Sequence, residues 1–331
     1  MAAPLAAFIS ILDIPDAIIQ AALSGETAVG VNPGVANSIF IHPTLPIVMD
    51  FTSKTDVWVS WYFYVASSPT LDQPFFTIKD TAGNTIVELR TGTVSGVSAA
   101  IRFYRRVGGV MTLVSTTATN ELIGSVGTRY DVHINLTAGT FDFYRDLGAA
   151  VIAYSGSLND GGAITDLRSA HFKSARAGTY HYGCTFWADT LDTRNGFWDE
   201  MTTSTAGFYA EQASGVEADI DEVGNISFTD KIILDAVGER ATFTQTGQNV
   251  TYAAGYDVQC FVVGTFAKKT TAGRLTSMVR SGTTDGEGAI SELTLTGVGV
   301  GGMFVNNPNG SVPWTYATVA AAQIGFRAKA P

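Results

Sequence analysis

The sequence predicts an all-β protein made of two antiparallel β-sandwich (jelly-roll) domains in tandem. β-Branched and aromatic residues alternate with polar residues over many short segments, as in strands with one buried face. Turns that contain glycine and asparagine separate these segments, and few stretches have a helical period. At 331 residues the chain is long enough to bury two hydrophobic cores.

Residues 1–50 are predicted to form a docking segment and the first strand of the sandwich. Within them, residues 16–23 could form two helical turns, with Asp16 as the N-cap. The apolar residues from Phe8 to Leu23 are not balanced by a charged face. We therefore expect this segment to lie against its own domain or against a neighbouring subunit.

Residues 51–195 carry the strongest strand pattern and are predicted to form the first jelly roll. Residues 57–65 place large side chains on both faces, which predicts a central strand that is covered on both sides. Three hairpins are expected to follow, at residues 75–90, 100–115 and 129–151.

Residues 196–331 are predicted to form a smaller β-sandwich. Its expected strands include residues 256–266, 274–281 and 291–297. The glycine-rich residues 297–304 are interpreted as a crowded strand or bulge beside another backbone. A phosphate-binding loop is excluded there because no long helix and no Lys-Ser/Thr pair follow.

Three segments resemble parts of one group of proteins. Residues 130–148, Y-D-V-H-I-N-L-T-A-G-T-F-D-F-Y-R-D-L-G, resemble the late hairpin of concanavalin-like, laminin-G-type jelly rolls. Residues 181–195, H-Y-G-C-T-F-W-A-D-T-L-D-T-R-N, are similar to the closing strand of such domains in tailed-bacteriophage virion proteins. Residues 307–316, N-P-N-G-S-V-P-W-T-Y, resemble a phage tail or fibre ending, in which this motif precedes a short helix and a last strand.

The resemblance implies a structural protein of a tailed-phage particle, located in the virion after assembly in the host cytoplasm. A tail-tip, baseplate or fibre position is expected, with head decoration as an alternative. Exposed sheet edges and apolar patches would bind other virion proteins and further copies of the chain, as a homo-oligomer. The alternative function is a carbohydrate-binding module that recognises host-surface glycans. The resemblance supplies no catalytic residues, and we expect the chain not to be an enzyme.

Charge, N-terminal sequence and cysteine spacing argue against several kinds of partner and cofactor. The net charge of −10 argues against binding to nucleic-acid phosphates. Early interruptions at Asp13 and Pro15 argue against a signal peptide or a membrane-inserted segment at the N-terminus. Cys184 and Cys260 have no C-x-x-C neighbour, so no redox or metal motif is indicated, and no cofactor is expected.

One acidic motif invites a catalytic interpretation. Residues 217–222, E-A-D-I-D-E, match the E-x-D-x-x-E pattern of laminarinase-like glycoside hydrolases. Glu217, Asp219 and Glu222 would then provide the paired carboxylates that a retaining glycosidase needs. The motif lies outside the first jelly roll and has no tryptophan close beside it. A solvated acidic strand is therefore the preferred interpretation, and a glycoside hydrolase is the remote alternative.

A second acidic group lies near the domain junction. The carboxylates of Asp189, Asp192, Asp199 and Glu200 are hard oxygen ligands that suit Ca²⁺, although their spacing differs from that of an EF-hand loop. The preferred interpretation is structural. It assigns Trp187, Asp192 and Arg194 to the junction, where Asp192 and Arg194 cap turns and pair locally.

Aromatic residues provide the last candidates. Trp58, Tyr62 and Tyr64 could contact a glycan, because aromatic faces stack against the C–H patches of sugars. The alternative is that they fill the sandwich core, as aromatic residues commonly do. Pro308 and Trp314 are predicted to anchor the C-terminal segment.

Overall fold

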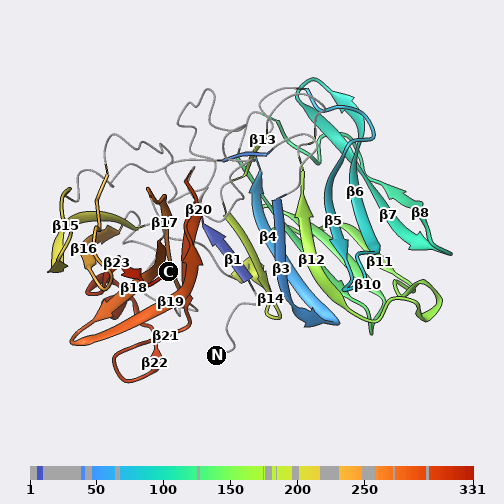
Figure 1. Ribbon diagram of the computed structural model, residues 1–331. Coiled ribbons are helices and arrows are strands. Elements are labelled where there is room, and N and C mark those ends of the chain that lie inside the picture. The colour runs from blue at the N-terminus through green and yellow to red at the C-terminus, as the bar shows by residue number, and fades with distance from the viewer. Residues whose placement is uncertain are drawn as a thin grey trace. The chain divides into compact units, whose positions relative to one another are not determined.

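The computed structural model describes residues 6–9, 39–41, 47–63, 68–124, 127–173, 175, 181–183, 185–195, 201–216, 231–247, 258, 260–270, 273–295 and 298–331. Strands make up nearly all of the regular structure in these residues, and every strand pairing with a described register is antiparallel (Figure 1). The predicted all-β fold class is therefore confirmed.

The chain divides into two compact units. The sandwich unit consists of Pro4–Phe8 and Gln20–Phe197, and the C-terminal unit consists of Met1–Ala3, Ile9–Ile19 and Trp198–Pro331.

Two six-stranded sheets form the sandwich unit. Sheet 1 contains, in spatial order, β1 (Ala6–Ile9), β14 (Thr185–Asp189), β4 (Asp56–Phe63), β9 (Thr128–Asn135), β10 (Thr140–Arg145) and β11 (Ala150–Ser155). Sheet 2 contains β3 (Ile47–Lys54), β12 (Leu167–Phe172), β5 (Pro74–Lys79), β6 (Thr85–Ser95), β7 (Ser98–Val107) and β8 (Val110–Thr116). The unit also has a small pair, β2 (Ile39–Ile41) with β13 (His181–Gly183), and two 3₁₀ turns, η2 (Asp160–Gly162) and η3 (Thr193–Asn195).

Aromatic side chains fill the space between the two sheets. Trp61 of sheet 1 stacks on Phe76 of sheet 2, with ring centroids 4.7 Å apart. Phe103 of sheet 2 stacks in the same way on Phe141 of sheet 1, at 4.3 Å. All four side chains are buried. The alternation of the strands sends these residues inward, so sheet 1 can present a different set of residues on its outer face.

The predicted hairpins are confirmed as the pairs β5–β6, β7–β8 and β9–β10. Their turns explain the choice of residues at the tips. Gly83, Gly109 and Gly139 all have positive φ, a backbone conformation that favours glycine. In the first turn, Asp80 also accepts hydrogen bonds from the main chain and the side chain of Asn84.

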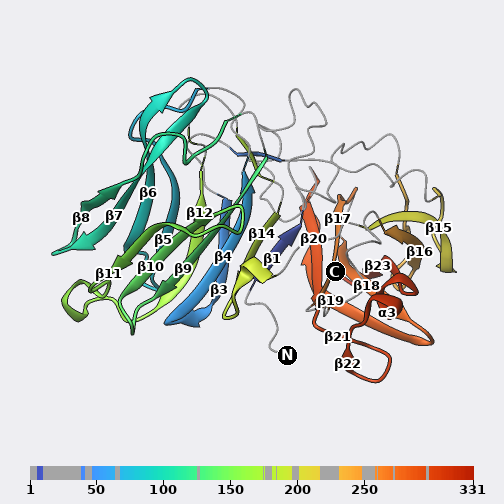
Figure 2. The same ribbon diagram turned by 180° about the vertical axis from the view of Figure 1, so that it is seen from behind.

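The C-terminal unit is built around a five-stranded sheet of β15 (Met201–Ala210), β16 (Arg240–Gly247), β23 (Gln323–Lys329), β18 (Arg274–Ser281) and β19 (Thr284–Glu292). The remaining elements are the pair β17 (Phe261–Ala267) and β20 (Val298–Phe304), the pair β21 (Asn306–Asn307) and β22 (Val312–Pro313), and α3 (Tyr316–Ala320). Figure 2 shows α3 directly before the last strand, β23. A short helix followed by a last strand was expected at this end of the chain.

One predicted strand of this unit was misplaced. The sequence pattern favoured residues 291–297, whereas β19 covers Thr284–Glu292. The glycines in β19 interrupt the alternation of apolar and polar residues that predicts a strand. They are needed there because the strand packs closely against its neighbours. A Cβ on Gly288 would lie 2.6 Å from Oγ of Ser277. The glycine-rich β20 meets the same crowding at Gly302, as predicted for that segment.

Candidate functional site

The outer face of sheet 1 carries a row of polar and aromatic side chains. The register aligns Trp58 of β4 with His133 of β9, and His133 with Asp142 of β10. One row further along, Asp131 of β9 pairs with Tyr144 of β10. These positions alternate with the buried residues of the core, so they lie on the opposite face of the same strands.

Three of these side chains form a stack, and Arg194 covers it. The rings of Trp58 and His133 are almost parallel, with centroids 4.3 Å apart, and Tyr144 stacks on Trp58 at 5.7 Å. The guanidinium carbon of Arg194 lies 4.1 Å from the centroid of the Tyr144 ring and 5.1 Å from that of Trp58. Cation–π attraction therefore holds Arg194 on this face.

His133 lies between two carboxylates. Its Nε2 is 2.8 Å from Oδ1 of Asp56, and its Nδ1 is 3.8 Å from Oδ2 of Asp142. Nδ2 of Asn135 donates a hydrogen bond to the other oxygen of Asp56, at 2.8 Å. The exposed fractions are 20% for the His133 side chain, 46% for Asp56 and 24% for Asp142, so solvent and ligands can reach all three. We call Asp56, His133 and Asp142 the Asp–His–Asp array.

A buried clamp fixes the segment that carries Arg194. Arg129 and Asp131 form a bidentate ion pair, with nitrogen–oxygen distances of 3.0 and 3.1 Å. Thr193 donates from Oγ1 to Asp131 at 2.7 Å, and its carbonyl oxygen accepts a hydrogen bond from Arg129. All three residues are buried. Since Thr193 directly precedes Arg194, the clamp positions the guanidinium above the stack.

The titration of the site follows from its contacts. Burial opposes ionisation of Asp192, but hydrogen bonds from Arg194 outweigh it and hold the pKa below the usual range. Burial raises the pKa of Asp142, against the opposing charges of His133 and Arg194. The burial of Tyr144, helped by the charge of Asp142, raises the pKa of its phenol. Asp192 thus stays ionised, while Asp142 is the carboxylate that gains a proton more readily than usual.

The predicted glycan contacts have different environments. Trp58 lies on the outer face as a member of the stack, but it is only 9% exposed, because His133 and Arg194 cover it. Tyr62 is half-buried on the same strand, and Tyr64 lies outside the described residues. Trp58 is therefore the floor of the site, and the Asp–His–Asp array provides the accessible groups.

The residues predicted for the domain junction are found next to this site. Asp192 and Arg194 form a local ion pair, with Nη2 to Oδ2 at 2.6 Å, and Oδ1 of Asp192 also accepts from the main-chain nitrogen of Arg194. Asp189 is buried, and its Oδ1 accepts hydrogen bonds from the main-chain nitrogens of Thr190 and Leu191. Trp187 lies on β14.

The candidate cation ligands do not come together in the described part of the chain. Asp189 and Asp192 are occupied by the turn contacts above, whereas Asp199 and Glu200 lie outside the described residues. Among the residues that the structure describes, no group of three or more histidine, cysteine, aspartate or glutamate side chains could hold a metal ion. Glu217, Asp219 and Glu222 of the acidic motif also lie outside the described residues.

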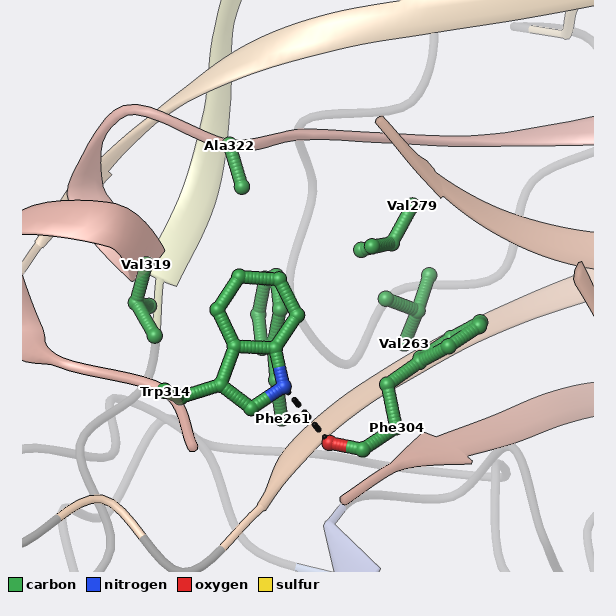
Figure 3. Close-up of a cluster of buried hydrophobic side chains, with 7 residues drawn as sticks. All are labelled: Phe261, Val263, Val279, Phe304, Trp314, Val319 and Ala322. Carbon is green, nitrogen blue, oxygen red and sulfur yellow. Dashed lines mark hydrogen bonds between the residues drawn. The ribbon is translucent and has the colours of Figure 1, made fainter. Parts of the chain in front are cut away.

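Of the two C-terminal candidates, Trp314 is part of a hydrophobic core. Trp314 is buried, and its indole nitrogen donates a hydrogen bond to the carbonyl oxygen of Phe304 at 2.8 Å (Figure 3). Its ring meets Phe261 edge to face, with centroids 5.4 Å apart. Thr315 and Thr318 then form a capping box that starts α3. Pro308 is half-buried in the segment between β21 and β22.

The motif search missed the Asp–His–Asp array. Its members come from three strands that are separated by up to 86 positions in the sequence, counted from Asp56 to Asp142. Part of the signal was available, because the hairpin of residues 130–148 alternates His133 and Asp142 with apolar neighbours. A register fixed by the turn at Gly139 would have paired these two positions.

No known protein family matches the sequence, and no curated protein resembles it. Solved structures with similarity include a GH43 protein, BlXynB from Bacillus licheniformis, with a TM-score of 0.35 and 10% identity over 46% of this chain and 32% of that chain. An alginate lyase, Aly36B, has a TM-score of 0.33 and 12% identity over 47% of this chain and 80% of its own. Sheep galectin-11 has a TM-score of 0.29 and 9% identity over 44% of this chain and 98% of its own.

These likenesses are confined to less than half of this chain, which spans about a third of the length of the GH43 protein. They still correct one expectation. The sequence led us to expect that the chain is not an enzyme, and this expectation is contradicted because the similar structures include a glycoside hydrolase and an alginate lyase. The physical reason is that strand pairing can bring together reactive side chains from distant segments, which no contiguous motif records.

The phage assignment stays a prediction. In the described residues, no helix has both the length and the apolar composition that a membrane span requires.

Proposed function

We propose that this protein binds carbohydrate through the outer face of β4, β9 and β10. The observation that carries the proposal is the Asp–His–Asp array beside a stack of aromatic rings on an accessible sheet face. Sugars present several hydroxyl groups in fixed directions, each of which can donate and accept a hydrogen bond. Carboxylates and an imidazole satisfy such groups at defined positions.

The fixed geometry supports this function. Asp56 is oriented from two sides by His133 and Asn135, and Trp58 supports the imidazole from below. A ligand therefore meets side chains that are already ordered, and less conformational entropy is lost on binding. Tyr144 adds an aromatic edge at one end of the array.

Calorimetric titration with a panel of neutral, amino and acidic oligosaccharides tests the proposal. We expect at least one class to bind saturably, and His133→Ala to weaken that binding by about tenfold, equivalent to ~1.4 kcal/mol. Asp50→Asn is the matched control, because Asp50 is an exposed carboxylate on sheet 2. Unchanged affinity in His133→Ala, with the fold intact, would place binding elsewhere.

A second proposal follows from the phage-like motifs: the chain is a structural component of a tailed-phage particle and assembles through protein contacts. The edge strand β8 supports it. This strand, V-M-T-L-V-S-T, has no charged residue and exposes Val110 and Leu113, whereas edge strands are commonly protected by charge. Light scattering should show an oligomer that Leu113→Lys dissociates. A wild-type monomer would remove this support.

A further inference from the structure

The two carboxylates of the Asp–His–Asp array have different partners. Asp56 uses both oxygens, one for Nε2 of His133 and one for Nδ2 of Asn135, each at 2.8 Å. For Asp142, the polar contact found among the described residues is with Nδ1 of His133. The distance of 3.8 Å is longer than an ordinary hydrogen bond. Asp142 therefore has acceptor capacity that the described residues do not use.

The tautomer of His133 decides what can occupy the space beside Asp142. A carboxylate only accepts hydrogen bonds, so a neutral His133 must donate from Nε2 to Asp56. Its Nδ1 then carries a lone pair on the side of Asp142. Two acceptors, Nδ1 of His133 and Oδ2 of Asp142, thus face each other across 3.8 Å, and no side chain in the described residues donates a hydrogen bond to both.

We infer that this pair of acceptors recognises the primary amino group of an amino sugar. A primary amine has at least two N–H donors, so one nitrogen atom can donate to both acceptors at once. A sugar hydroxyl has one donor, and an acetylated amine also has one. The inference rests on the proposed carbohydrate binding and names the class of sugar that the site selects.

The charge of the site favours the same ligand. The array contributes two carboxylates, which form no ion pair with an arginine or lysine in the described part of the chain. The nearby guanidinium of Arg194 forms bidentate bonds with Asp192, so the charges of these two residues offset each other. An amino group that carries a proton is attracted to such a surface, whereas a uronate or a sialate would be repelled.

Calorimetry with two matched ligands tests the inference. A glucosamine hexasaccharide should bind about tenfold more tightly than the N-acetylglucosamine hexasaccharide at a pH of about 8, where an ordinary histidine is neutral. Asp142→Asn should reduce this ratio to about one, because an amide can donate to Nδ1 of His133 in place of the ligand. Asp50→Asn is the control and should keep the ratio.

The outcomes separate the two claims. Equal affinity for both hexasaccharides, or tighter binding of the acetylated one, would overturn the amino-sugar inference and leave carbohydrate binding in place. The failure of every oligosaccharide to bind would overturn both. If Asp142→Asn does not fold, nuclear magnetic resonance on the wild-type protein replaces it. The glucosamine hexasaccharide should then shift the His133 imidazole signals and leave those of His171, on sheet 2, unchanged; the reverse pattern would contradict the inference.

Discussion

The two faces of sheet 1 use the same three strands for different purposes. Inward, β4, β9 and β10 present Trp61, Tyr130 and Phe143, which pack as a buried aromatic group with ring centroids 5.4–6.3 Å apart. Outward, they present Trp58 and His133 among carboxylates that solvent can reach. Aromatic content alone therefore does not identify a binding face. Trp58 differs from Trp61 because its ring contacts the polar side chains of His133 and Arg194.

The largest expected effect is on the inner face. Trp61→Ala removes a buried ring that contacts both sheets through Phe76 and Phe143, so it should lower the free energy of unfolding by about 3–5 kcal/mol. Chemical denaturation measures this loss. If Trp61→Ala cost no more than about 1 kcal/mol, the inner face would not be the main core of the sandwich unit.

The next effect lies beneath the outer face. Asp131→Ala leaves the guanidinium of Arg129 buried without its carboxylate, which typically costs about 3 kcal/mol or more. The same denaturation experiment checks it. A stability close to that of the wild type would show that Arg129 finds another partner and that the clamp is dispensable.

A smaller effect separates positioning from stability. Thr193→Val keeps the shape of the side chain but removes its hydrogen bond to Asp131, so the expected loss is about 1 kcal/mol. Within the clamp, the segment that carries Arg194 is then held only by the bond from Arg129 to the Thr193 carbonyl oxygen, so oligosaccharide affinity should fall as well. Stability that falls while affinity stays constant would mean that Arg194 does not shape the site.

The outer face of sheet 2 should respond to pH. Burial, together with the charge of Lys79, lowers the pKa of His171 to about 4. The unfolded chain binds this proton near the usual value of 6.5, so stability should fall as the pH drops from about 6.5 towards 4. Melting temperatures of the wild type and of His171→Gln across this range measure the contribution. Parallel curves for the two proteins would contradict it.

The fold was more predictable than the site. Alternation and turn residues located the hairpins, because a period of two and a glycine with positive φ are local properties. β19 was missed because its glycines make room for close packing, as at Ser277 of β18, and an alternation of apolar residues does not record such packing. The array was missed for a related reason. Asp56 lies beside His133 only through the pairing of β4 with β9, and no local pattern encodes that pairing.

The segment of Asp192 and Arg194 was partly predictable from the sequence. The local pair of Asp192 and Arg194 could be predicted from its i, i+2 spacing, and it is present. Arg194 also covers Trp58 and Tyr144. This position depends on the clamp, in which Thr193 binds Asp131, 62 residues earlier in the sequence, so a local pattern could not predict it.

The central claim is that ligand binds the outer face of sheet 1 and leaves the inner face undisturbed. The most direct measurement follows the indole N–H signals of the tryptophans by nuclear magnetic resonance during titration with the glucosamine hexasaccharide. We expect the Trp58 signal to shift saturably and the Trp61 signal to stay unchanged. A titration in which Trp58 stays still while the ligand binds, or in which both tryptophans shift equally, would contradict the claim.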